Sequence, residues 1–130
     1  YCIAPLALAH ALDKVRHPYN VSQTSIALAE TVLTRFGAEQ QQMIEATIAN
    51  RHRLVELLRR LPDAHVFPDH GNLVLVRFAS NEQARALQQQ LADAGVLVKD
   101  VTRVAKLHAC LRISVGTRED LDRLAAALSL

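Results

Sequence analysis

One arginine, Arg112, lies in an otherwise apolar and β-branched run near the C-terminal end of the sequence. The run reads Cys-Leu-Arg-Ile-Ser-Val-Gly-Thr over residues 110–117, and its alternation predicts a strand over residues 111–115. Desolvating a guanidinium is costly unless an anion meets it, and its forked donors suit a carboxylate or a phosphate. The run therefore indicates either a structural ion pair within the chain or a clamp for an anionic ligand, and spacing alone favours neither.

A second cation, Lys99, follows the apolar run at residues 96–98. That run predicts a strand, and the loop after a strand is a common place for ligand contacts. The alternative is an exposed lysine with no ligand. The six histidines show no His-Glu-x-x-His spacing, and no glycine-rich nucleotide-binding motif occurs, so we expect neither a metal centre nor a nucleotide cradle.

The composition limits the class of protein. With 130 residues, 50% of them hydrophobic, and a net charge of +2, the chain suits one compact globular domain. The charge gives no strong bias toward nucleic acid, and no run approaches the ~20 apolar residues of a membrane span. Two cysteines are too few for a disulfide framework. We therefore expect a cytoplasmic protein with reduced thiols that binds neither nucleic acid nor a membrane.

The first half of the chain predicts three helices that precede these cations. Apolar residues at helical spacing indicate helices over residues 6–15, 23–36 and 38–61. Ser22 is a suitable cap for the second helix, and Gly37 is expected to end it. The third helix has an apolar stripe that we expect to face the core: Ile44, Ile48, Val55 and Leu58.

The second half predicts the sheet that carries both cations. Strands are indicated at residues 66–67, 73–76, 96–98 and 111–115. Two helices alternate with them: one is capped by Ser80 and ends at Gly95, and the last is capped by Thr117 with Asp120. Three helices followed by β-β-α-β-β-α predict an α+β fold, an α/β two-layer sandwich whose small sheet is covered mainly on one side.

Five segments also occur together in a characteristic order and spacing: Tyr1-Cys2-Ile3-Ala4, Pro18-Tyr19-Asn20, Gly71-Asn72-Leu73-Val74-Leu75-Val76-Arg77, Gly95-Val96-Leu97-Val98-Lys99-Asp100 and Cys110-Leu111-Arg112-Ile113-Ser114-Val115-Gly116-Thr117. In this they resemble the C-terminal part of the histidinol-phosphate aminotransferase family, which has fold type I and depends on pyridoxal phosphate. The resemblance spans essentially the whole chain. Its last segment is the most specific, because these aminotransferases keep an arginine there for the α-carboxylate of the substrate.

The resemblance implies a role for four residues as substrate-binding groups. Arg112 is expected to hold the carboxylate of glutamate or 2-oxoglutarate, and with Lys99 to hold the phosphate of histidinol phosphate. The family usually has an arginine at the position of Lys99, and a lysine offers a point charge without a fork. Tyr19 and Asn20 match the family's loop near the active site, where they are expected to position the substrate.

The implied reaction is a ping-pong transamination of histidine biosynthesis, carried out by a homodimer. The amino group of glutamate passes to imidazole acetol phosphate, which becomes histidinol phosphate. In the family, the lysine that binds pyridoxal phosphate lies just before the segment that matches Tyr1. We therefore expect no catalytic and no cofactor-binding residue in this chain, a cofactor bound by the upstream portion, and no transamination by the chain alone.

The resemblance also implies a division into domains. Residues 1–36 are expected to contain the end of a large domain with connecting helices, and residues 37–130 to form a small C-terminal domain that begins with a long interdomain helix.

Two alternative functions remain open at this point. One is a threonine-phosphate decarboxylase or an aromatic aminotransferase of the same branch, and the other is a non-catalytic module that binds anions.

Overall fold

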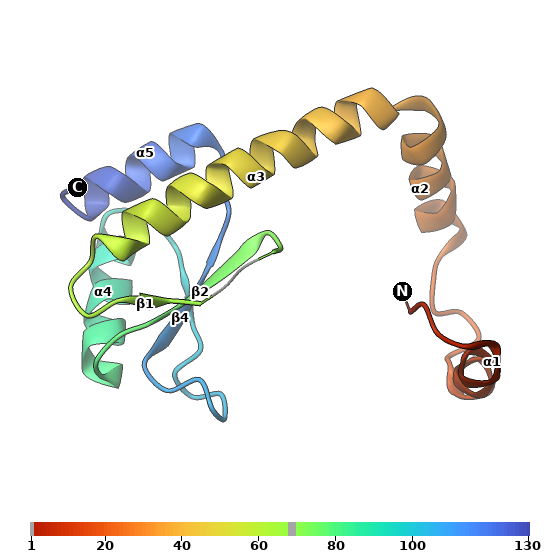
Figure 1. Ribbon diagram of the computed structural model, residues 1–130, viewed down its shortest axis with the longest axis horizontal. Helices are drawn as coiled ribbons and strands as arrows, with labels where there is room; N and C mark the ends of the chain where they lie inside the picture. The colour runs from red at the N-terminus through yellow and green to blue at the C-terminus, as the bar shows by residue number, and fades with distance from the viewer. Residues whose placement is uncertain (1, 68–69) are drawn as a thin grey trace. The chain divides into compact units, whose positions relative to one another are not determined.

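Nine elements of secondary structure follow one another in the computed structural model, which describes residues 2–67 and 70–130. In chain order they are α1 (Leu6–Val15), α2 (Gln23–Arg35), α3 (Gly37–Arg59), β1 (His65–Val66), β2 (Leu73–Arg77), α4 (Asn81–Asp93), β3 (Lys99–Asp100), β4 (Cys110–Ser114) and α5 (Arg118–Ala127) (Figure 1). The chain divides into two compact units, residues 1–41 and residues 42–130. Helix α3 begins in the first unit and ends in the second.

Side-chain caps start three of the helices, as the sequence predicts. The hydroxyl of Ser22 accepts a hydrogen bond from the Ser25 amide at 3.1 Å, and the hydroxyl of Ser80 accepts one from the Gln83 amide at 3.2 Å. A reciprocal pair joins Thr117 and Asp120 at the start of α5. Each cap satisfies an amide that has no partner within its own helix, which fixes where the helix begins.

The predicted end of α4 at Gly95 is also confirmed. Gly95 has φ +78°, and the Val96 amide then donates to the Leu91 carbonyl at 2.8 Å. Glycine adopts this left-handed conformation at little cost. In contrast, Gly37 does not end the second helix as expected, because α2 ends at Arg35 and Gly37 is the first residue of α3.

The four strands form one antiparallel sheet in the order β1-β2-β4-β3. Three of the predicted strands are confirmed, with ends shifted by at most one residue. The prediction of a strand at residues 96–98 is wrong. The chain leaves the Gly95 turn with the Val96 amide already bonded to α4, and it reaches β4 only at Lys99. Val96 and Val98 instead pack against the core from outside the ladder.

The core of the second unit lies between one face of the sheet and the helices. Alternate residues of β2 and β4 point into it: Val74, Val76, Leu111 and Ile113. They meet buried residues of the C-terminal half of α3, of α4 and of α5, which Figure 1 shows next to the sheet. This arrangement of one sheet and one helical layer confirms the predicted α+β two-layer sandwich.

The apolar stripe predicted for α3 is only half correct. Val55 and Leu58 are buried, whereas Ile44 and Ile48 are 45% and 39% exposed. Only the C-terminal half of α3 runs over the sheet, so only that half contributes to the core. Helices α1 and α2 form where predicted, yet they contain no buried residue. Helical spacing alone therefore located the helices without showing which parts are covered within this chain.

The side chain of Leu111 is fully buried in β4, so its truncation tests the core. We expect Leu111→Ala to lower the free energy of unfolding by about 2–5 kcal/mol, because it removes apolar contacts and leaves a cavity. Urea denaturation followed by circular dichroism measures this. Leu97→Ala is the matched control, since Leu97 is 86% exposed and should change stability little. Equal losses in the two variants would contradict this core.

Candidate functional site

The candidate site lies on the sheet face that the helices leave open. In β4, Leu111 and Ile113 are buried while Arg112 and Ser114 are exposed, because successive side chains of a strand point to opposite faces. Arg112 is thus not inside the apolar layer, although its sequence neighbours are. A shallow hollow of about 240 Å³ covers this part of the face, lined by Leu97, Val98, Lys99, Arg112 and Ser114.

Lys99 and Arg112 face each other across the pair of strands β3 and β4. They are direct partners in the antiparallel register, so their side chains leave the sheet on the same face. Both residues are exposed. Like charges directly opposite one another destabilise a sheet, and a bound anion between them would remove that repulsion. The pair is therefore better suited to an anionic ligand than to the sheet alone.

The alternative of a structural ion pair for Arg112 finds no support. Across residues 2–67 and 70–130, no hydrogen bond or salt bridge involves its guanidinium. The same ranges contain interhelical and loop ion pairs elsewhere, such as Arg53 with Asp122. All the donors of the Arg112 fork are thus available to a carboxylate or a phosphate.

Tyr19 and Asn20 belong to the first unit, in the turn between α1 and α2. The amide of Tyr19 donates to Nδ1 of His17 at 3.2 Å, and Oδ1 of Asn20 accepts from Arg16 at 3.3 Å. The Tyr19 side chain is 87% exposed. These contacts define a local turn, and the expected role of the two residues toward a substrate stays a prediction.

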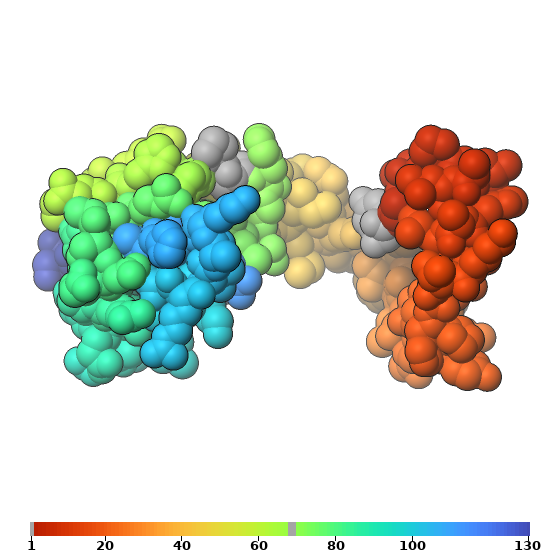
Figure 2. All heavy atoms as spheres, turned by 90° about the horizontal axis from the view of Figure 1, so that it is seen from below, coloured from red at the N-terminus to blue at the C-terminus, as the bar shows by residue number. Residues whose placement is uncertain are grey.

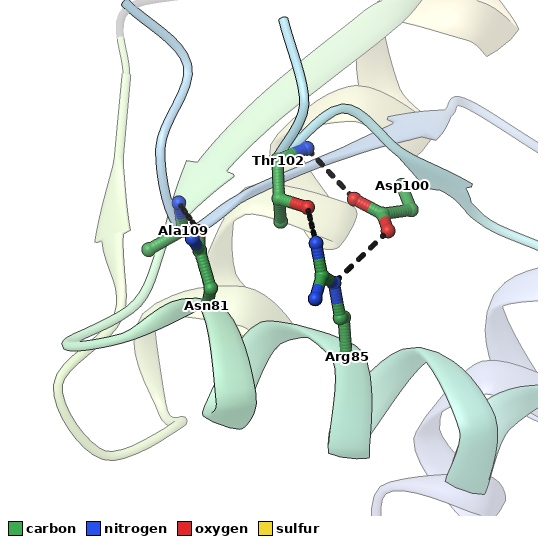
Figure 3. Close-up of polar contacts among 5 residues, drawn as sticks. All are labelled: Asn81, Arg85, Asp100, Thr102 and Ala109. Carbon is green, nitrogen blue, oxygen red and sulfur yellow. Dashed lines mark hydrogen bonds and ion pairs between the residues drawn. The ribbon is translucent and has the colours of Figure 1, made fainter.

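A polar network near Lys99 was not predicted from the sequence. It connects α4 to the segment that follows β3, and it contains Arg85, Asp100 and Thr102 (Figure 3). The amide of Thr102 first, then its hydroxyl and the guanidinium of Arg85, hold the pKa of Asp100 below its usual range. An exposed helical arginine and a threonine in a turn have no sequence signature, so only the folded chain shows that they meet.

The lysines are the side chains of this chain that could bond to a carbonyl cofactor. The three lysines, Lys14, Lys99 and Lys106, are all exposed, and Lys99 already lies in the hollow beside Arg112. A lysine that attacks a carbonyl is usually activated by burial or by a special electrostatic environment.

Comparisons with known proteins identify the family of the chain. The sequence model of the family "Aminotransferase class I and II" matches residues 1–128. The chain belongs to this aminotransferase family. None of the helices in the described part of this aminotransferase chain combines the length and apolar character needed to cross a bilayer.

Relatives of this aminotransferase chain include two enzymes named histidinol-phosphate aminotransferase. That of Methylibium petroleiphilum is 40% identical over 98% of the chain and 34% of its own length. That of Aquifex aeolicus is 31% identical over 90% of the chain and 32% of its own length. The chain thus spans about a third of the length of these relatives.

Solved structures show the same fold. A putative aminotransferase from Burkholderia pseudomallei is 33% identical with a TM-score of 0.72, covering 96% of this chain and 37% of that one. The histidinol-phosphate aminotransferase of Sinorhizobium meliloti, solved with pyridoxal 5'-phosphate, is 27% identical with a TM-score of 0.71, covering 94% and 33%. The chain accordingly has the fold of part of a fold type I aminotransferase.

Removal of Arg112 tests whether this residue stabilises the fold. We expect Arg112→Ala to change the free energy of unfolding of the chain by no more than about 0.5 kcal/mol, because an exposed side chain without an acidic partner is lost. Breaking a buried ion pair would instead cost about 3–5 kcal/mol. Urea denaturation distinguishes the two values, and a loss in the larger range would show that the arginine holds the domain together.

Proposed function

We propose that the protein to which this chain belongs is a histidinol-phosphate aminotransferase, and that this chain supplies its clamp for the anionic end of the substrate. The observation that carries the proposal is the pairing of Lys99 with Arg112 on an open sheet face, with no acidic partner for Arg112 among the described residues. The family membership and the names of the relatives support the reaction class.

The proposed reaction uses glutamate with 2-oxoglutarate and histidinol phosphate with imidazole acetol phosphate as its two pairs of substrates. Pyridoxal phosphate would serve as the electron sink that accepts and returns the amino group, bound by other parts of the polypeptide. We further propose a homodimer in the cytoplasm, on the basis of the family resemblance and of cysteine use. The role of this chain is to bind and orient the substrate.

Orientation by Arg112 follows from the planar fork of its guanidinium. Two parallel hydrogen bonds to one carboxylate fix the plane of that group, and hence the direction of the amino-bearing carbon. Correct placement of a reacting group can lower the barrier by several kcal/mol. Because β4 is paired on both sides, with β2 and β3, the backbone that carries the fork has little freedom to move.

Lys99 adds the second charge that a phosphate requires. A phosphate dianion carries more charge than a carboxylate, and a compact ammonium satisfies it without a fixed geometry. A carboxylate can be held by Arg112 alone, whereas the phosphate would engage both cations. One site can thereby accept both substrates in turn. Tyr19 and Asn20 are proposed to position the substrate from their turn.

The kinetic role of Arg112 can be measured in the full-length enzyme. We expect Arg112→Ala to reduce kcat/KM for glutamate by about 3 kcal/mol, roughly a hundredfold, because orientation and charge are both lost. Arg112→Lys should recover only part of the loss, since it keeps the charge without the fork. Arg59→Ala, an exposed arginine in the last turn of α3, is the control. A variant with unchanged kinetics would refute the clamp.

The proposed role of Lys99 can be tested by measuring which substrate its removal affects. In the full-length enzyme, Lys99→Ala should weaken histidinol phosphate by about tenfold or more while affecting glutamate much less, because charge-assisted contacts contribute roughly 1.5–3 kcal/mol. Steady-state kinetics with each substrate measures the difference. Lys106→Ala removes a lysine that is also exposed but does not line the hollow, so both substrates should be unaffected. Equal losses for the two substrates in Lys99→Ala would contradict the assignment.

A further inference from the structure

The strand that carries Lys99 is short and lies at the edge of the sheet. Strand β3 has two residues, Lys99 and Asp100, which pair with Arg112 and Leu111. The ladder continues with one bond, from the Val101 amide to the Cys110 carbonyl at 3.3 Å. So few backbone bonds give an edge strand little stability of its own. Something besides the ladder must keep Lys99 opposite Arg112.

Helix α4 supplies that support through a group that we call the clasp, formed by Arg85, Asp100 and Thr102 (Figure 3). Nε of Arg85 lies 3.6 Å from Oδ2 of Asp100, and its Nη2 donates to the hydroxyl of Thr102 at 3.1 Å. The Thr102 amide donates to Oδ1 of Asp100 at 2.7 Å. Thr102 is only 3% exposed, so this part of the clasp is shielded from water.

The other end of the same segment is also tied to α4. The amide of Ala109, just before β4, donates to Oδ1 of Asn81 at 2.6 Å. Asn81 lies one helical turn before Arg85, and Figure 3 shows the two side chains rising from adjacent turns of α4. The segment between β3 and β4 lies at the surface beside α4, in light blue in Figure 2. Helix α4 therefore holds both ends of this segment.

The clasp acts on Lys99 through the alternation of the strand. Asp100 is next to Lys99, so its side chain leaves the strand toward the opposite face. Fixing Asp100 to α4 on that side turns Lys99 toward the open face, where it meets Arg112. Arg112 does not depend on the clasp in the same way, because its strand β4 also pairs with β2 over five residues.

We propose that Arg85 and Asp100 are positioning residues, which set the place of Lys99 opposite Arg112 and thereby favour a phosphorylated substrate over one that carries only carboxylates. The inference rests on the proposed function. The inference extends that function by assigning substrate preference to residues that do not line the hollow.

Two variants of the full-length enzyme test the proposal. In Asp100→Asn and in Arg85→Gln, we expect KM for histidinol phosphate to rise about fivefold, because the ammonium of Lys99 is less well placed. KM for glutamate should stay within about twofold, since the Arg112 fork is unaffected. Arg85→Lys should restore part of the loss through its charge near Asp100. Asp122→Asn is the matched control, because it breaks the Arg53–Asp122 pair between α3 and α5, away from β3.

A second measurement on the 130-residue chain does not depend on activity. Amide hydrogen exchange at Val101 reports the opening of the last bond between β3 and β4. In Asp100→Asn and Arg85→Gln, we expect this amide to exchange about tenfold faster, because the charged contacts that hold the segment are weakened. Amides in the centre of β4 should be unaffected, and so should Val101 in Asp122→Asn.

The outcomes separate this inference from the proposed function. Faster exchange at Val101 together with a selective rise in KM for histidinol phosphate supports the clasp. Unchanged exchange at Val101 overturns the clasp. Faster exchange also overturns it if KM changes equally for the two substrates or for neither. If the wild-type enzyme transaminates neither substrate, the proposed function fails, and the assignment of substrate preference to the clasp fails with it. Faster exchange in the variants would then still show that the contacts hold β3.

Discussion

The two-faced character of β4 is the constraint on which the rest of this domain depends. Leu111 and Ile113 pack into the helical layer of the second unit, and the alternation of the strand then forces Arg112 and Ser114 onto the open face. The burial of the apolar residues thus determines where the charge goes. A shift of register by one residue would place the guanidinium in the core and expose Leu111 to water. Both changes would lower the free energy of unfolding.

The elements next to β4 support the site in different ways. Strand β2 pairs with β4 over its full length and gives it a rigid neighbour. Strand β3 adds the second cation but pairs over two residues only, so contacts from α4 complete its support. The reciprocal cap of Thr117 and Asp120 starts α5 at Arg118, four residues after β4 ends, which fixes the exit of the strand. The proposed anion site is therefore a property of the packed domain and not of a single loop.

Much of this arrangement could be predicted from the sequence because its causes are local. Caps, the left-handed glycine at position 95 and the alternation at residues 111–115 act over a few residues, and they led to the correct elements and fold class. Arg112 could be singled out because a charged residue in an apolar run is conspicuous without any knowledge of the fold. The resemblance to a family added the expected chemistry, which spacing alone left open.

The parts that the sequence did not predict depend on contacts between distant residues. Arg85 and Thr102 are 17 positions apart and meet only when α4 packs beside β3. The strand expected at residues 96–98 begins later, because the position of β4, and not local propensity, decides where pairing starts. Ile44 and Ile48 fit a buried stripe by their spacing, but the sheet does not extend beneath that half of α3.

The facing cations also have a consequence for work at the bench. If the proposed clamp accepts a phosphate ester and a carboxylate in turn, it would not distinguish them strictly from the small oxyanions of common buffers. Phosphate, sulfate and citrate would occupy the same two side chains and compete with the substrate, all the more at low ionic strength, where exposed charges are least screened. Affinities measured in such solutions would describe this competition, and a zwitterionic buffer with chloride as the only anion would reveal the intrinsic values.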